Sequence, residues 1–234
     1  NQGGTAGGVS GPPPGGDMTG RIQTALAVMA GLAGPAAAHP HIFVDTTLTL
    51  RINDRAEVES VEVRWLYDEL FSLLMMQDMG VDDDADGELT ADEMAVIDGW
   101  DMKWIEGYSG DLYLTGADGE EIALGDREPV SSDVTDARMV SVHRRPLDPA
   151  VPAEGLMLQA YDPEFYTAYD LTGGVHLTGP GAPLCRAGIG FPDQDAAYRE
   201  AQEVMAAFPE DAEEVPLLGH LFAQKGTIRC GSGG

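Results

Sequence analysis

Positive charge is scarce in this sequence of 234 residues. It has 13 lysines and arginines against 40 aspartates and glutamates, so its formal net charge is −27, and its only lysines are Lys103 and Lys225. A nucleic-acid-binding protein needs a basic surface to contact phosphates, and attachment to an anionic membrane needs clusters of lysine and arginine. We therefore expect neither a nucleic acid nor a membrane surface as a partner.

The motifs of several enzyme classes are also missing. There is no G-x-S-x-G nucleophile elbow, no H-E-x-x-H helix and no glycine loop of the kind that binds phosphates. No C-x-x-C pair is present to suggest a redox catalyst or a thiolate zinc site. The sequence therefore indicates no catalytic residue and favours a protein that is not an enzyme.

The first 38 residues lack the composition of a folded domain. Residues 1–17 are rich in glycine and proline, and we interpret them as a disordered upstream segment. Residues 18–38 combine the cation Arg21, the short apolar run 25–33 and small residues before His39. This order is typical of a secretory signal peptide, and its apolar run is too short for a membrane anchor. We expect a periplasmic protein that begins at His39 after cleavage.

Only two cysteines are present, Cys185 and Cys230. In an exported protein an even number of cysteines is usually paired, because the compartment is oxidising. The sequence therefore predicts a disulfide between Cys185 and Cys230.

Residues 39–234 are long enough for one globular domain with a sizeable core. Alternating apolar residues predict strands at 42–52 and 58–65, joined as an antiparallel pair. Beyond residue 107 short alternating segments separated by Gly, Pro and Asp are typical of a β-sandwich or barrel. These segments are 111–115, 121–124, 137–144, 155–161, 165–171 and 175–178. Helical spacing returns at 195–208 and, more weakly, at 217–222.

Between these two β-rich parts, apolar spacing predicts two helices. The first runs from Tyr67 towards Met79, with Asp68 as its cap. The second opens with the capping box Thr90 to Glu93 and carries an apolar stripe that ends before Gly107. The predicted fold class is therefore α+β: an antiparallel β-sandwich-like domain with an inserted EF-hand helix-loop-helix, about 67–106, and short C-terminal helices.

The twelve residues 82–93, which link the two predicted helices and include the capping box of the second, match the EF-hand calcium loop. Calcium takes six to eight oxygen ligands, which must converge from one tight turn. The template assigns these ligands to the side chains of Asp82, Asp84, Asp86, Thr90 and Glu93 and to the carbonyl of Glu88. Gly87 permits the bend. Because only one such loop is present, we expect the calcium ion to stabilise the fold rather than to act as a sensor.

The residues after the predicted cleavage point form a second candidate metal site. His39 and His41 are two imidazoles close to a new α-amine, and these nitrogen donors suit zinc, copper or nickel. Pro40 has no amide proton, so copper cannot bind there through a deprotonated backbone nitrogen. The arrangement resembles the copper histidine brace. The alternative is that both histidines are merely polar residues at a frayed end.

The other histidines are weaker candidates. His143 and His176 each alternate with apolar neighbours on a predicted strand, so either could be a third metal ligand, although a surface histidine is the simpler interpretation. His220 lies in a mostly apolar stretch and is interpreted as structural. The aromatic and acidic segment 161–166 could line a site, but Asp162 followed by Pro163 is already explained by a turn.

Several of these segments together resemble the bacterial domain of unknown function 1007 family (DUF1007). They are 39–45, 65–72, the acidic loop with its helices, 160–166 and the two cysteines. Members of that family are generally regarded as periplasmic components of an uncharacterised ABC-type transport system, often encoded near metal-uptake genes. The resemblance thus implies metal ions as partners, and a metal ABC transporter or its binding protein as a further partner.

Three functions fit these observations. The first is a periplasmic protein that binds a transition metal, zinc, nickel or copper, as an accessory of an uptake system and carries a structural calcium site. The second is a copper-dependent redox enzyme that uses the terminal histidines. The third is a calcium-stabilised interaction module without a transition metal.

Overall fold

The computed structural model of this chain describes residues 40–84, 87–105, 107–209 and 216–231. The chain divides into two units, Asn1–Ala38 and His39–Gly234. The predicted upstream segment 1–17 and signal peptide 18–38 lie outside the described residues, as do His39 and Asp86.

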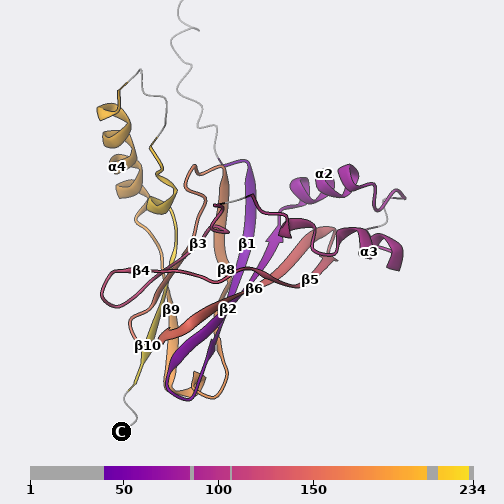
Figure 1. Cartoon of the computed structure of the whole chain (residues 1–234). Coiled ribbons are helices and arrows are strands. Elements are labelled where there is room, and N and C mark those ends of the chain that lie inside the picture. Colours follow the sequence, from indigo (N-terminus) through magenta and orange to yellow (C-terminus); the bar gives the residue numbers. More distant parts are fainter. Residues whose placement is uncertain (1–39, 85–86, 106, 210–215, 232–234) are drawn as a thin grey trace, which may run out of the picture. The chain divides into compact units, whose positions relative to one another are not determined.

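The first sheet has five strands in the order β5-β6-β2-β1-β8 (Figure 1). They are β1 (Ile42–Ile52), β2 (Glu57–Tyr67), β5 (Glu128–Thr135), β6 (Arg138–Pro152) and β8 (Thr167–Thr178). The predicted antiparallel pairing of β1 with β2 is confirmed, with Leu48 opposite Val63. β1 also pairs with β8 in parallel, so this sheet is mixed rather than purely antiparallel.

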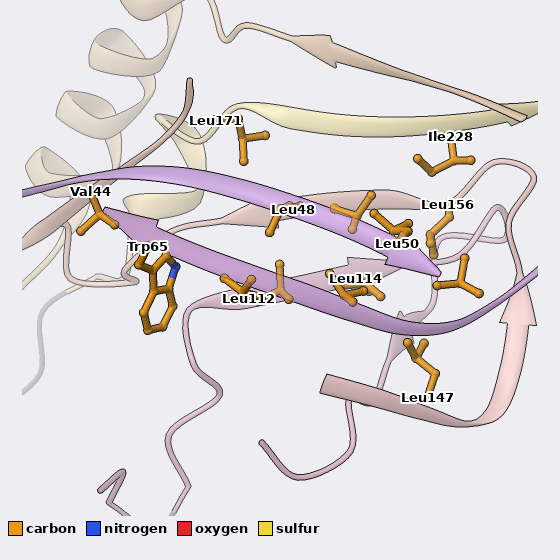
Figure 2. Close-up of a cluster of buried hydrophobic side chains, with 14 of the residues drawn as sticks. Val44, Leu48, Leu50, Trp65, Leu112, Leu114, Leu147, Leu156, Leu171 and Ile228 are labelled. Carbon is orange, nitrogen blue, oxygen red and sulfur yellow. The ribbon is translucent and has the colours of Figure 1, made fainter. Parts of the chain in front are cut away.

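The second sheet has the order β4-β3-β7-β10-β9. Its strands are β3 (Leu112–Thr115), β4 (Glu121–Ile122), β7 (Met157–Ala160), β9 (Cys185–Gly190) and β10 (Lys225–Cys230). Apolar side chains from both sheets meet in one hydrophobic core, which includes Leu48 and Leu50 of β1, Leu114 of β3 and Ile228 of β10 (Figure 2). All four are fully buried. Burial of these side chains is the main force that joins the sheets.

Three α-helices are described: α2 (Glu69–Met79), α3 (Ala91–Ile97) and α4 (Gln194–Ala207). Asp68 caps α2 as predicted, since its Oδ1 accepts a hydrogen bond from the Phe71 amide at 2.9 Å. α2 and α3 lie together near the β5–β6 side of the first sheet (Figure 1). Short 3-10 helices occur at Trp100–Met102 (η1), Ala182–Leu184 (η2) and Gly219–Leu221 (η3).

The predicted fold class α+β with an inserted EF-hand is wrong. The described part of the chain is mostly β, with 43% of these residues in strands against 22% in helices, and no EF-hand occurs among them. The sequence pattern missed β5 and β9 entirely and divided β8 into two segments. β5 has mostly exposed side chains, so it lacks the apolar alternation from which a strand is predicted.

The second predicted helix is broken, which explains why the helix-loop-helix differs from its template. α3 has seven residues and ends at Ile97, after which Gly99 adopts a left-handed φ of 62° and η1 begins. The apolar stripe that predicted one continuous helix is thus divided. Trp100 and Trp104 instead pack against aromatic side chains of the first sheet, at 5.2 Å from Tyr67 and 6.4 Å from Trp65 respectively. Tertiary packing overrides the local helical pattern here.

The predicted disulfide is confirmed. Cys185 and Cys230 stand opposite each other in the β9–β10 pair, and their sulfur atoms are bonded. The bond closes a loop with a sequence separation of 45 residues. Such a cross-link stabilises the fold mainly by restricting the unfolded chain. Among the described residues, no helix has both the length and the apolar character needed to cross a membrane.

Candidate functional site

The acidic loop joins its first residue to its last through a hydrogen bond from the Asp82 amide to the Glu93 carboxylate. α2 ends at Met79 and is capped by Gly80. Asp82 then adopts a left-handed φ of 57° and donates its amide proton to Oε1 of Glu93 at 2.9 Å. The Gly87 amide donates to Oδ1 of Asp82 at 3.2 Å. The described part of the loop is therefore a compact turn closed by Glu93.

The carboxylate of Glu93 is fully engaged by hydrogen bonds. Its Oε2 accepts from the hydroxyl of Thr90 at 2.7 Å and from the Thr90 amide at 2.8 Å, so the predicted capping box is present. The Thr90 hydroxyl is the largest of the causes that lower the pKa of Glu93. To bind calcium through both of its carboxylate oxygens, Glu93 would have to give up these hydrogen bonds. Within the described residues, no three His, Cys, Asp or Glu side chains are grouped to hold a metal. Calcium binding by the loop therefore stays a prediction.

His41, the only terminal histidine among the described residues, precedes β1 and is held by Tyr166, the residue before β8. Its amide donates to the carbonyl of Tyr166 at 2.8 Å, and its ring lies 4.9 Å from the Tyr166 ring. His39 lies outside the described residues. The structure thus gives His41 a defined place beside the β1–β8 pair.

Neither His143 nor His176 lies near His41. His143 stands opposite Val63, which stands opposite Leu48, and His176 stands opposite Thr49. Both are therefore seven or eight residues along the sheet from His41, or roughly 23 to 26 Å at the rise of a strand. A third ligand for a terminal site does not come from either of them.

A cavity of about 460 Å³ opens beside the first residues of β1. It is lined by residues of β1, β8, the 160–165 turn and the segment before β10, including Phe43, Asp45, Tyr161, Tyr169, Asp170 and Phe222. Asp45 is also paired with Arg138 at 2.8 Å. Aromatic walls with a few polar groups are typical of a small-ligand site.

The segment 161–166 contributes to this cavity and also forms the predicted turn. Oδ1 of Asp162 accepts from the Glu164 amide, and Oδ2 accepts from the amides of Tyr166 and Thr167. Because Asp162 makes the turn, Tyr161 and Phe165 both line the cavity. The two interpretations of this segment are therefore compatible.

A buried polar patch around His143 was missed by the sequence pattern. His143 is 0% exposed, so its interpretation as a surface histidine is wrong. Its ring lies 4.7 Å from Trp65 and 5.3 Å from Trp104, and neither ring nitrogen has a hydrogen-bond partner among the described residues. Burial, followed by the charges of Arg145 and Arg127, lowers the pKa of His143 to about 3. The imidazole is therefore neutral at ordinary pH.

A covering segment, residues 100–105 and 107–111, buries this patch. Ser141 donates its hydroxyl proton to Asp101, and Arg145 donates to the carbonyl of Ser109 at 2.6 Å. Arg145 also lies over the Trp104 ring, 5.3 Å from its centroid. Ser141, His143 and Arg145 share one face of β6, so the two residues that flank His143 hold the cover above it.

Gly110 shows how closely this cover is packed. Its φ is +80°, and an added Cβ would lie 2.4 Å from the Trp104 ring and 2.9 Å from the Arg145 guanidinium. No larger residue fits there without moving Trp104. The only sign of this patch in the sequence is that polar residues alternate at positions 141, 143 and 145. Without knowledge of the covering segment, that alternation predicts a polar face exposed to solvent.

Asp111, at the end of this segment, forms a second buried group. Its Oδ2 accepts from the hydroxyls of Tyr108 at 2.8 Å and Tyr169 at 2.9 Å. Burial is the largest cause that raises the pKa of Asp111 to about 6. Asp111 lines a second cavity, of about 500 Å³, together with Tyr113 and Glu164.

Comparison with known proteins identifies the family. No curated protein matches this chain in sequence. The model of the protein family of unknown function DUF1007 matches residues 24–230, which is most of the chain. The resemblance noted in the sequence is therefore confirmed at the level of the family, and the chain belongs to the DUF1007 family.

Proposed function

We propose that this chain is a periplasmic transition-metal-binding protein that serves as an accessory component of a metal-uptake system. The observation that carries the proposal is the position of His41. The hydrogen bond to Tyr166 fixes its backbone beside the cavity that begins at Phe43. An imidazole held at the first strand is a ligand whose position does not depend on a frayed end.

The remaining ligands proposed are His39 and the α-amine that cleavage after Ala38 would create. Imidazole and amine nitrogens prefer zinc, copper or nickel to calcium. An α-amine has a pKa near 8, so a metal ion can displace its proton around neutral pH. The disulfide between Cys185 and Cys230 is compatible with an oxidising compartment such as the periplasm.

The experiment compares metal affinity between two versions of the folded protein, one that starts at His39 and one with an additional alanine before it. The extension keeps both imidazoles but moves the amine. Calorimetric titration with copper, zinc and nickel should show at least a tenfold loss for the extended form and for His41→Ala. His176→Ala is the matched control, because His176 is exposed and lies far along the sheet.

Equal affinity of the two forms would remove the amine from the proposal. Absence of binding by either form would overturn the transition-metal function and favour a calcium-stabilised module. Copper binding accompanied by catalytic redox turnover would favour the redox enzyme instead.

We propose calcium as a second ion, bound by oxygen atoms of the 82–93 loop. This proposal is supported by the contact of Glu93 with Asp82, which brings the two ends of the loop together. Neighbouring carboxylates repel one another without a cation, so calcium would stabilise this turn. The melting temperature with calcium and with a chelator tests it.

A further inference from the structure

α2 presents an apolar face to solvent that the fold does not use. Ser72 and Met76 are its buried residues, and the Ser72 hydroxyl accepts a hydrogen bond from the Met139 amide of β6 at 2.9 Å. These contacts fix which side of the helix faces the sheet. At 100° per residue, Leu70 and Leu74 then lie on the side opposite the sheet, and Leu73 lies on the flank of the helix next to Leu70.

These three leucines are well exposed. Their exposed fractions are 65% for Leu70, 57% for Leu73 and 54% for Leu74. Their spacing of three and four residues makes one continuous stripe on the helix. Phe43, also 54% exposed, is joined through its backbone by two hydrogen bonds to Asp68, the residue before α2.

A helix that is apolar around its whole circumference is normally buried on all sides. The inner face of α2 already uses Met76, with Phe71, Met75 and Met79 packed partly against the core. The outer leucines therefore contribute nothing to this packing. Contiguous apolar patches of this kind on a soluble protein mark interaction sites.

The charge around the stripe indicates what covers it. Residues 65–102 contain twelve Asp and Glu but no Lys, Arg or His. Within this part of the chain Glu69, Asp78, Asp83, Asp84, Asp92 and Asp98 are exposed. Glu69 and Asp78 lie on α2 with the leucines, and an apolar stripe in so acidic a stretch complements a segment that is apolar on one face and basic on the other.

We infer that the outer face of α2 is a docking site for a basic amphipathic helix of a partner protein. The leucines bury the partner's apolar face, and the surrounding carboxylates attract its lysines and arginines. Two other occupants are disfavoured by charge. A second copy of this chain carries the same net charge of −27, and an anionic bilayer would be repelled by the same carboxylates.

The test uses a synthetic peptide of roughly 18 residues, with Leu at helical spacing on one face and Lys elsewhere. A scrambled peptide of the same composition has no apolar face. Fluorescence anisotropy should show that the chain binds the first peptide more tightly than the second. Raising the salt to about 0.5 M should weaken the binding, because exposed charges are then screened.

The deciding variant is the double substitution Leu73→Gln/Leu74→Gln. Each lost leucine contact should weaken binding about tenfold. The matched control is Val204→Gln/Met205→Gln, which removes two exposed apolar side chains of α4 and should leave binding unchanged. Both pairs of residues are exposed. Melting temperatures of the two double variants that equal that of the wild type would show that the fold is intact.

Absence of peptide binding, or equal binding by the two double variants, would overturn the inference. Flotation with vesicles that requires Leu73 and Leu74 would assign the face to a membrane instead. Dimerisation in analytical ultracentrifugation that the same substitutions abolish would assign it to a second copy. These measurements need no metal at His41, so they can fail or succeed independently of the proposed function.

Discussion

The acidic loop between α2 and α3 and the buried patch around His143 place ionisable groups in opposite environments. In the loop, Glu93 is held at the surface by hydrogen bonds that favour its charged form and lower its pKa. In the patch, His143 is enclosed by Trp65 and Trp104, and burial favours its neutral form. A titratable side chain is thus held in its charged form in the loop and in its neutral form in the patch.

The comparison shows how the surroundings of a titratable side chain shift its pKa: hydrogen bonds do so in the loop, and burial does so in the patch. The loop is built by contacts within twelve residues, so its turn and capping box follow from local sequence. The patch is built by β2, β6 and the covering segment, which are distant in the chain. Local contacts should therefore be easy to alter without loss of the fold, whereas changes in the patch should alter global stability.

The largest expected effect is that of Trp65→Ala. Trp65 is 3% exposed and contacts His143 and Tyr169, so its removal leaves a large cavity. We expect the free energy of unfolding to fall by about 3 to 5 kcal/mol. Leu74→Ala on the exposed face of α2 should cost less than about 1 kcal/mol. Urea denaturation measures both, and equal losses would contradict the difference between the buried patch and the exposed surface.

Asp111→Asn should stabilise the protein at alkaline pH. The folded-state pKa of Asp111 is raised from 3.8 to about 6, so its contribution to stability is fully present below pH 3.8 and is lost as pH rises through 6. Asparagine keeps an acceptor for both tyrosines and tolerates the left-handed φ of 50°. At pH 8 we expect a gain of roughly 2 to 3 kcal/mol in the free energy of unfolding.

The control for this gain is Asp54→Asn, which changes an exposed turn residue. If Asp111→Asn changes the free energy of unfolding by the same amount as Asp54→Asn, both at pH 8 and at pH 4, then burial does not govern the pKa of Asp111.

His143→Phe should remove a loss of stability in acid. The folded-state pKa of His143 is lowered from 6.5 to about 3, so protonation favours the unfolded chain as pH falls below 6.5. Between pH 7.5 and pH 5, the wild type should lose about 2 kcal/mol more than the phenylalanine variant. Phenylalanine suits the apolar contacts with Trp65 and Trp104. Parallel pH profiles of the two proteins would refute this prediction, and His176→Gln is the exposed control.

The smallest expected effect is that of calcium on the loop. If the dissociation constant is on the order of 10⁻⁴ M, about 1 mM calcium should raise the free energy of unfolding by roughly 1.4 kcal/mol. Glu93→Gln should abolish this gain, whereas Glu200→Gln on the exposed face of α4 should retain it. Thermal denaturation with and without a chelator measures the effect. A melting temperature of the wild type that does not respond to calcium would rule out a working site.

Several elements were predictable because local residues determine them. The alternation in β1 and β2 gave their pairing, Asp68 gave the start of α2, and Thr90 with Glu93 gave the capping box. The pairing of Cys185 with Cys230 followed from their number and the expected compartment. Each of these features depends on neighbouring residues or on counting, so no knowledge of distant contacts was needed.

What the sequence alone determined is therefore the hairpin, the capped helix, the disulfide and the excess of acidic charge. Only the tertiary structure decided that β1 pairs in parallel with β8, that the helix expected to reach Gly107 breaks at Gly99, and that His143 is buried. The physical reason is that the burial of a side chain depends on the distant segment of the chain that packs against it. Ser141, His143 and Arg145 alternate as a solvent-facing strand would, until the covering segment removes them from water.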